Sequence, residues 1–169
     1  MSADDFSADC SRCAALCCMA LAFDAGEDFG HDKPAGYPCR HLEGFSCSIH
    51  AGLAEAGYHG CVRFDCLGAG QRVTALFAGT WRDDPALTRP MMRAFRRMRD
   101  IQELRQMLVA AATLPLPAAQ EGERRAWLSR LERAQNDAGA LERAEIAEAR
   151  HWLRGLAAHV PRRERRASR

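Results

Sequence analysis

The chain has 169 residues, enough for one ordinary domain or for a small stabilised module joined to a helical region. Its net charge is +2, and its eight cysteines all lie between Cys10 and Cys66. No apolar run reaches the roughly 18 residues that a membrane-spanning helix needs, and the acidic start Met1–Asp5 is unlike a secretory signal. We therefore expect a cytoplasmic protein that does not enter a membrane.

The two halves of the chain differ in charge. Residues 1–80 carry five cationic and ten anionic side chains, for a net charge of −5. Residues 81–169 carry nineteen and twelve, for a net charge of +7. This difference predicts two units with different surfaces, a cysteine-rich module over 1–80 and a helical region over 81–160. The remaining residues 161–169 are expected to form a basic, disordered tail.

The first predicted element is a short helix over residues 8–22. Alanine, leucine and methionine fill most of its non-cysteine positions, and Asp9 is a candidate N-cap. On such a helix Cys10, Cys13 and Cys17 follow the spacing i, i+3 and i+7, so they share one face. Cys18 lies about 100° away from that face and is expected to serve a second site or the core.

The rest of the cysteine-rich module shows little periodicity. Residues 23–45 contain repeated glycine and proline and are expected to be loop. A short helix is predicted over 46–57, a short strand over 62–65 and a tight turn over 68–71. So little regular structure cannot bury an ordinary core, which favours stabilisation by a structural metal.

Three helices are predicted in the second half, over residues 90–114, 118–135 and 140–159. Apolar residues recur there at spacings of three and four, and arginines occupy the other positions. The predicted fold is therefore mainly α, with an irregular, metal-stapled cysteine-rich N-terminal module and C-terminal antiparallel helices.

The cysteines are the residues that carry chemistry. Thiols clustered at short spacing are held by metal or by disulfides, and a reducing cytosol favours metal. Cys10-x2-Cys13 and Cys47-x2-His50 have the spacing of paired zinc ligands, and Cys61-x4-Cys66 is a looser pair. Disulfides and buried, unligated thiols remain open. The candidate metal ligands are Cys10, Cys13, Cys17, Cys18, Cys39, Cys47, His50, Cys61 and Cys66.

Most histidines are not expected to be ligands. His31 and His41 fall in predicted loop and are expected to be solvated, and His59 is a weaker candidate than His50. His50 is favoured because a helix over 46–57 would place it on the same face as Cys47.

These motifs resemble the YkgJ-type cysteine-rich family, whose members are described as zinc- or iron-chelating proteins. The likeness rests on Cys10-x2-Cys13 with Cys17-Cys18, on Pro38–Leu42, on Phe45–His50, and on Cys61 and Cys66. Three residues instead of two separate Cys13 from Cys17, and His50 stands where the family usually has tyrosine.

The stretch from Cys10 to Val73 is also similar to the cysteine-rich N-terminal segment of certain actinobacterial pentapeptide-repeat proteins. The pentapeptide repeats themselves are missing here, so no function of a repeat domain carries over. Both resemblances imply metal chelation by the cysteines.

The sequence therefore predicts a protein that holds zinc, or else iron, in a structural or regulatory role. One alternative is an iron–sulfur redox protein, because the same thiolates bind such clusters. Another is a protein- or nucleic-acid-interaction module that uses the arginine-rich helices as its contact surface. Of these two partners, nucleic acid is the less expected, because glutamates interleave with the arginines. No catalytic constellation is visible.

Overall fold

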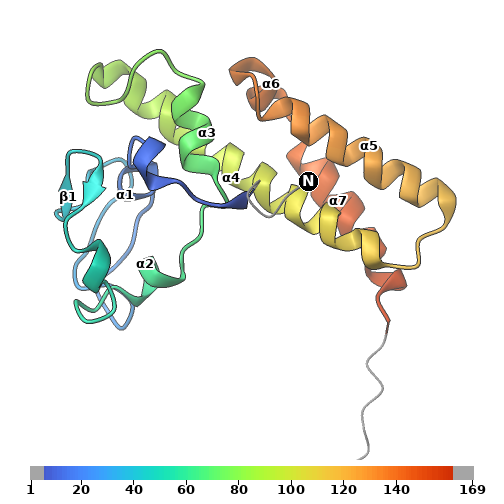
Figure 1. Cartoon of the computed structure of the whole chain (residues 1–169), viewed down its shortest axis with the longest axis horizontal. Helices are drawn as coiled ribbons and strands as arrows, with labels where there is room; N and C mark the ends of the chain where they lie inside the picture. Colours follow the sequence, from blue (N-terminus) through green and yellow to red (C-terminus); the bar gives the residue numbers. More distant parts are fainter. Residues whose placement is uncertain (1–5, 162–169) are drawn as a thin grey trace, which may run out of the picture.

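The computed structural model describes residues 6–161. Helix α4 (Thr88–Ala110) runs through the middle of the molecule. The cysteine-rich segment lies on one side of it, and α5 (Ala118–Ala134), α6 (Ala138–Arg143) and α7 (Ile146–Gly155) lie on the other (Figure 1). The mainly helical class is thus confirmed, while the predicted tail 162–169 and the acidic start 1–5 lie outside the described residues.

The apolar positions of α4 form the centre of the core. Its fully buried apolar side chains are Met91, Phe95, Met98, Ile101, Leu104 and Leu108. They pack against residues of α1 (Leu16–Ala20) and α3 (Ala69–Ala75) as well as against α5, α6 and α7. One continuous core therefore contains residues from both sides of residue 80.

The helices predicted over 90–114 and 118–135 are confirmed as α4, followed by the 3-10 turn η5 (Ala111–Thr113), and α5. The single helix predicted over 140–159 is wrong, because the chain breaks into α6, α7 and the 3-10 turn η6 (Leu156–His159). The break follows from Arg97 on α4, which donates hydrogen bonds of 2.9 Å to the carbonyls of Leu141 and Ala144. Those bonds satisfy carbonyls that a continuous helix would use internally.

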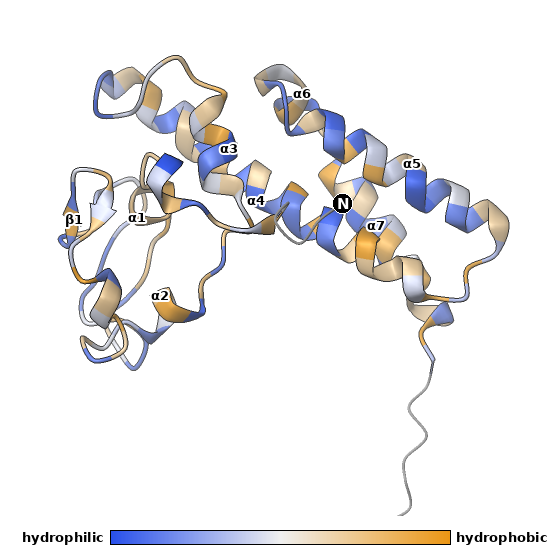
Figure 2. Cartoon of the chain, in the orientation of Figure 1, coloured by the Kyte–Doolittle hydropathy of each residue, from blue (hydrophilic) through white to orange (hydrophobic). Residues whose placement is uncertain are grey.

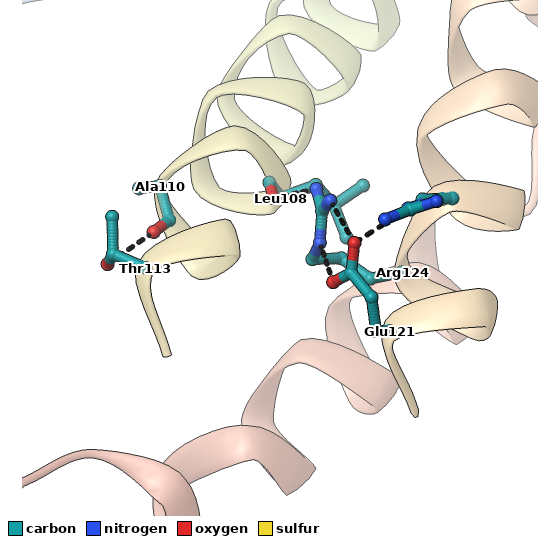
Figure 3. Close-up of polar contacts among 6 residues, drawn as sticks. Leu108, Ala110, Thr113, Glu121 and Arg124 are labelled. Atoms are coloured by element: carbon teal, nitrogen blue, oxygen red, sulfur yellow. Dashed lines mark hydrogen bonds and ion pairs between the residues drawn. The ribbon is translucent and has the colours of Figure 1, made fainter. Parts of the chain in front are cut away.

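A buried arginine joins α4 to α5 (Figure 3). Arg124 donates to the Leu108 carbonyl at 2.9 Å and forks onto both carboxylate oxygens of Glu121, at 2.7 and 2.8 Å. Hydrogen bonds from Arg124 and Arg125 lower the pKa of Glu121 to about 2. Because the folded pKa is depressed, this pair stabilises the fold above the ordinary pKa of the carboxyl, and the contribution is lost as the pH falls toward about 2.

The helix predicted over residues 8–22 is wrong. The chain instead forms the 3-10 turn η2 (Cys10–Arg12), an extended link at Cys13, and then α1. Ala14 is held by distant residues, since its N–H donates to Thr74 Oγ1 at 3.0 Å and its carbonyl accepts from Trp81 Nε1 at 2.7 Å. Ala15 follows with a left-handed φ of 53°. These tertiary bonds override the local preference for helix.

Three other local predictions also differ from the structure. In place of a helix over 46–57 there is a hairpin of β1 (Leu42–Glu43) with β2 (Ser46–Cys47), then the 3-10 turn η3 (His50–Gly52). In place of a strand over 62–65 there is α2 (His59–Arg63). The tight turn predicted at 68–71 is shorter and earlier, at Leu67 and Gly68, and helix α3 begins directly after it at Ala69.

The segment between α1 and α3 lacks an aliphatic core of its own. Between residues 21 and 67, the buried side chains are the polar Lys33 and the aromatic Tyr58. Helices α1 and α3, which flank this segment, are anchored on α4. Within residues 6–161, no helix combines the length and the apolar character needed to cross a bilayer.

Candidate metal centre

Four thiols line one small cavity beside α4. They belong to Cys10 in η2, Cys13 in the extended link, Cys17 in α1 and Cys66 just before α3. The cavity has a volume of about 20 Å³, close to the space of a single water-sized sphere. We call these four residues the first thiol group. Cys10, Cys13 and Cys17 do not share one helical face as predicted. All three nevertheless line this cavity, together with Cys66.

Two loops position this group. Asp9 caps η2 by accepting from the Ser11 N–H at 3.1 Å, and the Asp9 N–H donates to the Gln71 side chain at 3.2 Å. After Cys66, Leu67 and Gly68 adopt left-handed φ values of 52° and 76°, which turns the chain sharply into α3. These contacts bring the two loops to the same end of α3.

Gly70 allows the thiols to approach α3. A Cβ atom at this position would lie 2.5 Å from the Cys13 Sγ and 4.0 Å from the Cys66 Sγ. Any side chain larger than hydrogen would therefore displace the Cys13 thiol. The sequence pattern assigned Gly70 to a turn, so it did not predict that this glycine makes room for the Cys13 thiol.

The other four cysteines come from four different elements. Cys18 lies in α1, Cys39 in the loop after it, Cys47 in β2 and Cys61 in α2. We call them the second thiol group. The Cys39 N–H donates to the Cys18 carbonyl at 3.0 Å, and Cys61 interacts electrostatically with Cys39 and Cys47.

Cys17 lies between the two groups. Its Sγ is 3.9 Å from the Cys18 Sγ. Cys17 also interacts electrostatically with Cys10 and Cys13 on one side and with Cys61 on the other. The two groups are therefore neighbours.

The surroundings disfavour negative charge on the thiols. Burial, reinforced by the neighbouring thiols, raises the pKa of Cys13 and of Cys61 to about 11. The hydrogen bond with Cys18, together with burial, raises the pKa of the Cys17 thiol. All eight cysteines are free. With raised pKa values, the thiols of Cys13, Cys17 and Cys61 favour the protonated form unless a cation neutralises them.

Lys33 supplies one buried positive charge at this centre. It is the lone lysine of the sequence and is 3% exposed. Its ammonium donates to the carbonyls of Leu21 at 2.5 Å, Pro34 at 3.3 Å and Met19 at 3.4 Å. It also interacts electrostatically with Cys39, Cys18 and Cys17. A buried role for Lys33 was not predicted from the sequence, although a single lysine among so many arginines was a signal that could have indicated one.

The histidines are arranged differently from the prediction. His31 and His41 are half-buried, and each has a ring nitrogen within 2.9 Å of the Tyr58 hydroxyl. The other ring nitrogen of His31 lies 4.0 Å from the Cys39 Sγ. His50 is exposed at the first residue of η3, so the helical face that it was to share with Cys47 does not exist. His31 and His41 were predicted to be solvated, and in the structure both are partly exposed while contacting the Tyr58 hydroxyl.

Over the described range 6–161, no three or more His, Cys, Asp or Glu side chains stand close enough together to hold a metal ion as they are. Metal binding would require the thiols of a group to draw closer. Zinc–sulfur bonds are about 2.3 Å long, so neighbouring sulfurs in a tetrahedral site lie about 3.8 Å apart.

Comparisons with known proteins give no functional assignment. No family model and no solved structure matches the chain. The chain is similar to the uncharacterized protein YybG of Bacillus subtilis (strain 168), with 37% identity over 132 residues. The match includes 76% of this chain, so it must extend beyond residue 80, and the chain spans about half of that protein, 47%.

Proposed function

We propose that this chain binds one or two metal ions through its clustered thiols. The observation that carries the proposal is the small cavity lined by Cys10, Cys13, Cys17 and Cys66. The second thiol group would hold a second ion. Each group has four soft donors, the number that a closed structural zinc site uses.

The charge and packing around the thiols support this proposal. A divalent ion held by four thiolates leaves a net negative charge. The buried ammonium of Lys33 would offset part of that charge, because it interacts electrostatically with Cys39, Cys18 and Cys17. The segment between α1 and α3 also needs a source of stability other than apolar burial. A structural metal would supply it by tying Cys39, Cys47 and Cys61 to α1.

Metal analysis tests the proposal directly. Protein expressed in defined medium and purified anaerobically without chelator is expected to contain about one to two equivalents of zinc per chain. Visible thiolate–iron absorption bands and equivalent iron would instead support the iron–sulfur alternative. A content below about 0.3 equivalents, with all eight thiols still titratable, would contradict metal binding altogether.

Gly70→Ala is expected to abolish the first site selectively. The new methyl group would displace the Cys13 thiol, so one metal equivalent should be lost while the second remains. Gly122→Ala in α5 is the matched control, because a Cβ there meets no atom within 4 Å. The measurement is metal content per folded chain. Retention of full metal content by Gly70→Ala would contradict a site at this cavity.

The interaction alternative has weaker support. Several helical arginines are paired with carboxylates, including Arg93 with Glu142 at 3.2 Å and Arg150 with Asp100 at 3.0 Å. Paired, exposed charges of this kind are typical of a solvated helical surface. Metal binding therefore remains the proposed function, in a structural or regulatory role.

A further inference from the structure

A second, larger pocket lies in the helical half, away from the cysteines in the sequence. It has a volume of about 280 Å³ and opens between α5, α6 and the residue before α7. Its charged and aromatic lining consists of Trp127, Arg130, Arg133, Arg143 and Glu145. We call it the arginine pocket. Its volume is near the lower end of the range for sites that bind small molecules.

Three arginines, Arg130, Arg133 and Arg143, and one glutamate, Glu145, line this pocket. Arg130 lies over the Trp127 ring, 4.8 Å from its centroid, and pairs with Glu145 at 3.4 Å. Arg133 donates to a neutral partner, the Ser129 hydroxyl, at 2.6 Å. Among the described residues, no carboxylate forms an ion pair with Arg133 or Arg143. Positive charge therefore exceeds negative charge in the pocket.

Arg143 has room to extend along α6. A Cβ atom at Gly139 would lie 3.1 Å from its Nη1 and 3.3 Å from the Asp137 Oδ1, so the guanidinium and this N-cap carboxylate lie near the same point of α6. Hydrophilic residues alternate with apolar ones along α5 (Figure 2). Arg133 on α5 and Arg143 on α6 thus border one pocket from two helices.

The remaining lining is apolar. Leu131, Ala134, Ala140 and Ala144 contribute to it together with the Trp127 indole. A ligand that fits has to present oxygen acceptors to the guanidinium forks and an apolar part to this surface. Arginine forks match the geometry of phosphate and carboxylate oxygens, and the surplus positive charge favours the more highly charged of these, phosphate.

We propose that the arginine pocket binds a small phosphate monoester that carries an apolar group. The residues that line this pocket all lie between Trp127 and Glu145, apart in the sequence from the cysteines. Binding is expected to weaken as salt is added, because the arginines concerned are exposed and their charges are screened.

The test is calorimetric titration of the full, metal-loaded chain at low ionic strength. Phenyl phosphate is expected to bind saturably, with one molecule per chain, and more tightly than inorganic phosphate. Arg133→Gln and Arg143→Gln should each weaken binding at least about tenfold, the loss expected when a charge-assisted hydrogen bond is removed. Arg89→Gln, which removes one exposed charge at the start of α4, should leave affinity within about twofold.

Three results would overturn the proposal. Equal affinity for inorganic phosphate would show that the apolar part is not recognised. Equal weakening by Arg89→Gln would show that only overall charge matters. No saturable binding of phenyl phosphate would show that the pocket is not a site. Circular dichroism of each variant verifies that the helices remain folded, since the substituted arginines are exposed.

Discussion

If the thiols hold metal as proposed, its removal by a strong chelator is expected to unfold residues 21–67 while α4 to α7 remain helical. A structural zinc site contributes on the order of 10 kcal/mol to the folding of a segment that has no core. This segment has only Lys33 and Tyr58 as buried side chains. In contrast, Leu16, Val73 and the apolar side of α4 share one hydrophobic core, which apolar burial stabilises.

Hydrogen exchange read by mass spectrometry resolves the two regions. After chelation, the backbone N–H groups of Cys39, which donates to the Cys18 carbonyl, and of Phe23, which donates to the Lys33 carbonyl, should lose their protection from exchange. The N–H groups of α4 should keep theirs. Chelator pre-loaded with zinc is the matched control, and zinc added back should restore protection. If verified metal removal leaves the exchange of residues 21–67 unchanged, metal is not what stabilises this segment.

The long helices could be predicted from the sequence because their signal is strong and local. In α4, Met91, Phe95, Met98 and Ile101 recur at helical spacing, and all four are fully buried. The same pattern did not reveal the break between α6 and α7. That break depends on Arg97, which lies more than forty positions away in the sequence from the carbonyls it contacts.

The sequence predicted which cysteines are involved, but not how they are grouped in space. Cys10, Cys13 and Cys17 were expected to meet through one helix, but Thr74 and Trp81 hold Ala14 in an extended link instead. The cysteines still converge, because the link and η2 pack against α3 at Gly70. Spacing along the chain therefore indicated the candidate donors, and long-range hydrogen bonds determine how these cysteines are grouped.

Substitution of cysteines is expected to separate the two proposed metal sites. Cys13→Ser places a hard, weakly acidic hydroxyl where a soft thiolate is needed and should cost one metal equivalent. Cys61→Ser should cost the other equivalent, because Cys61 interacts with Cys39 and Cys47. The double variant should bind no metal tightly.

Cys17→Ser is expected to affect both sites, because its thiol lines the first cavity and lies 3.9 Å from the Cys18 Sγ. It should lose the first equivalent and raise the exchange rate of the second, measured by competition with a coloured chelator. Cys10→Ser is the comparison, since Cys10 belongs to the first group and should leave the second ion's exchange rate unchanged. If Cys13→Ser and Cys61→Ser lose the same equivalent, and their combination loses no more than either alone, the eight thiols form a single shared site and the division into two groups is wrong.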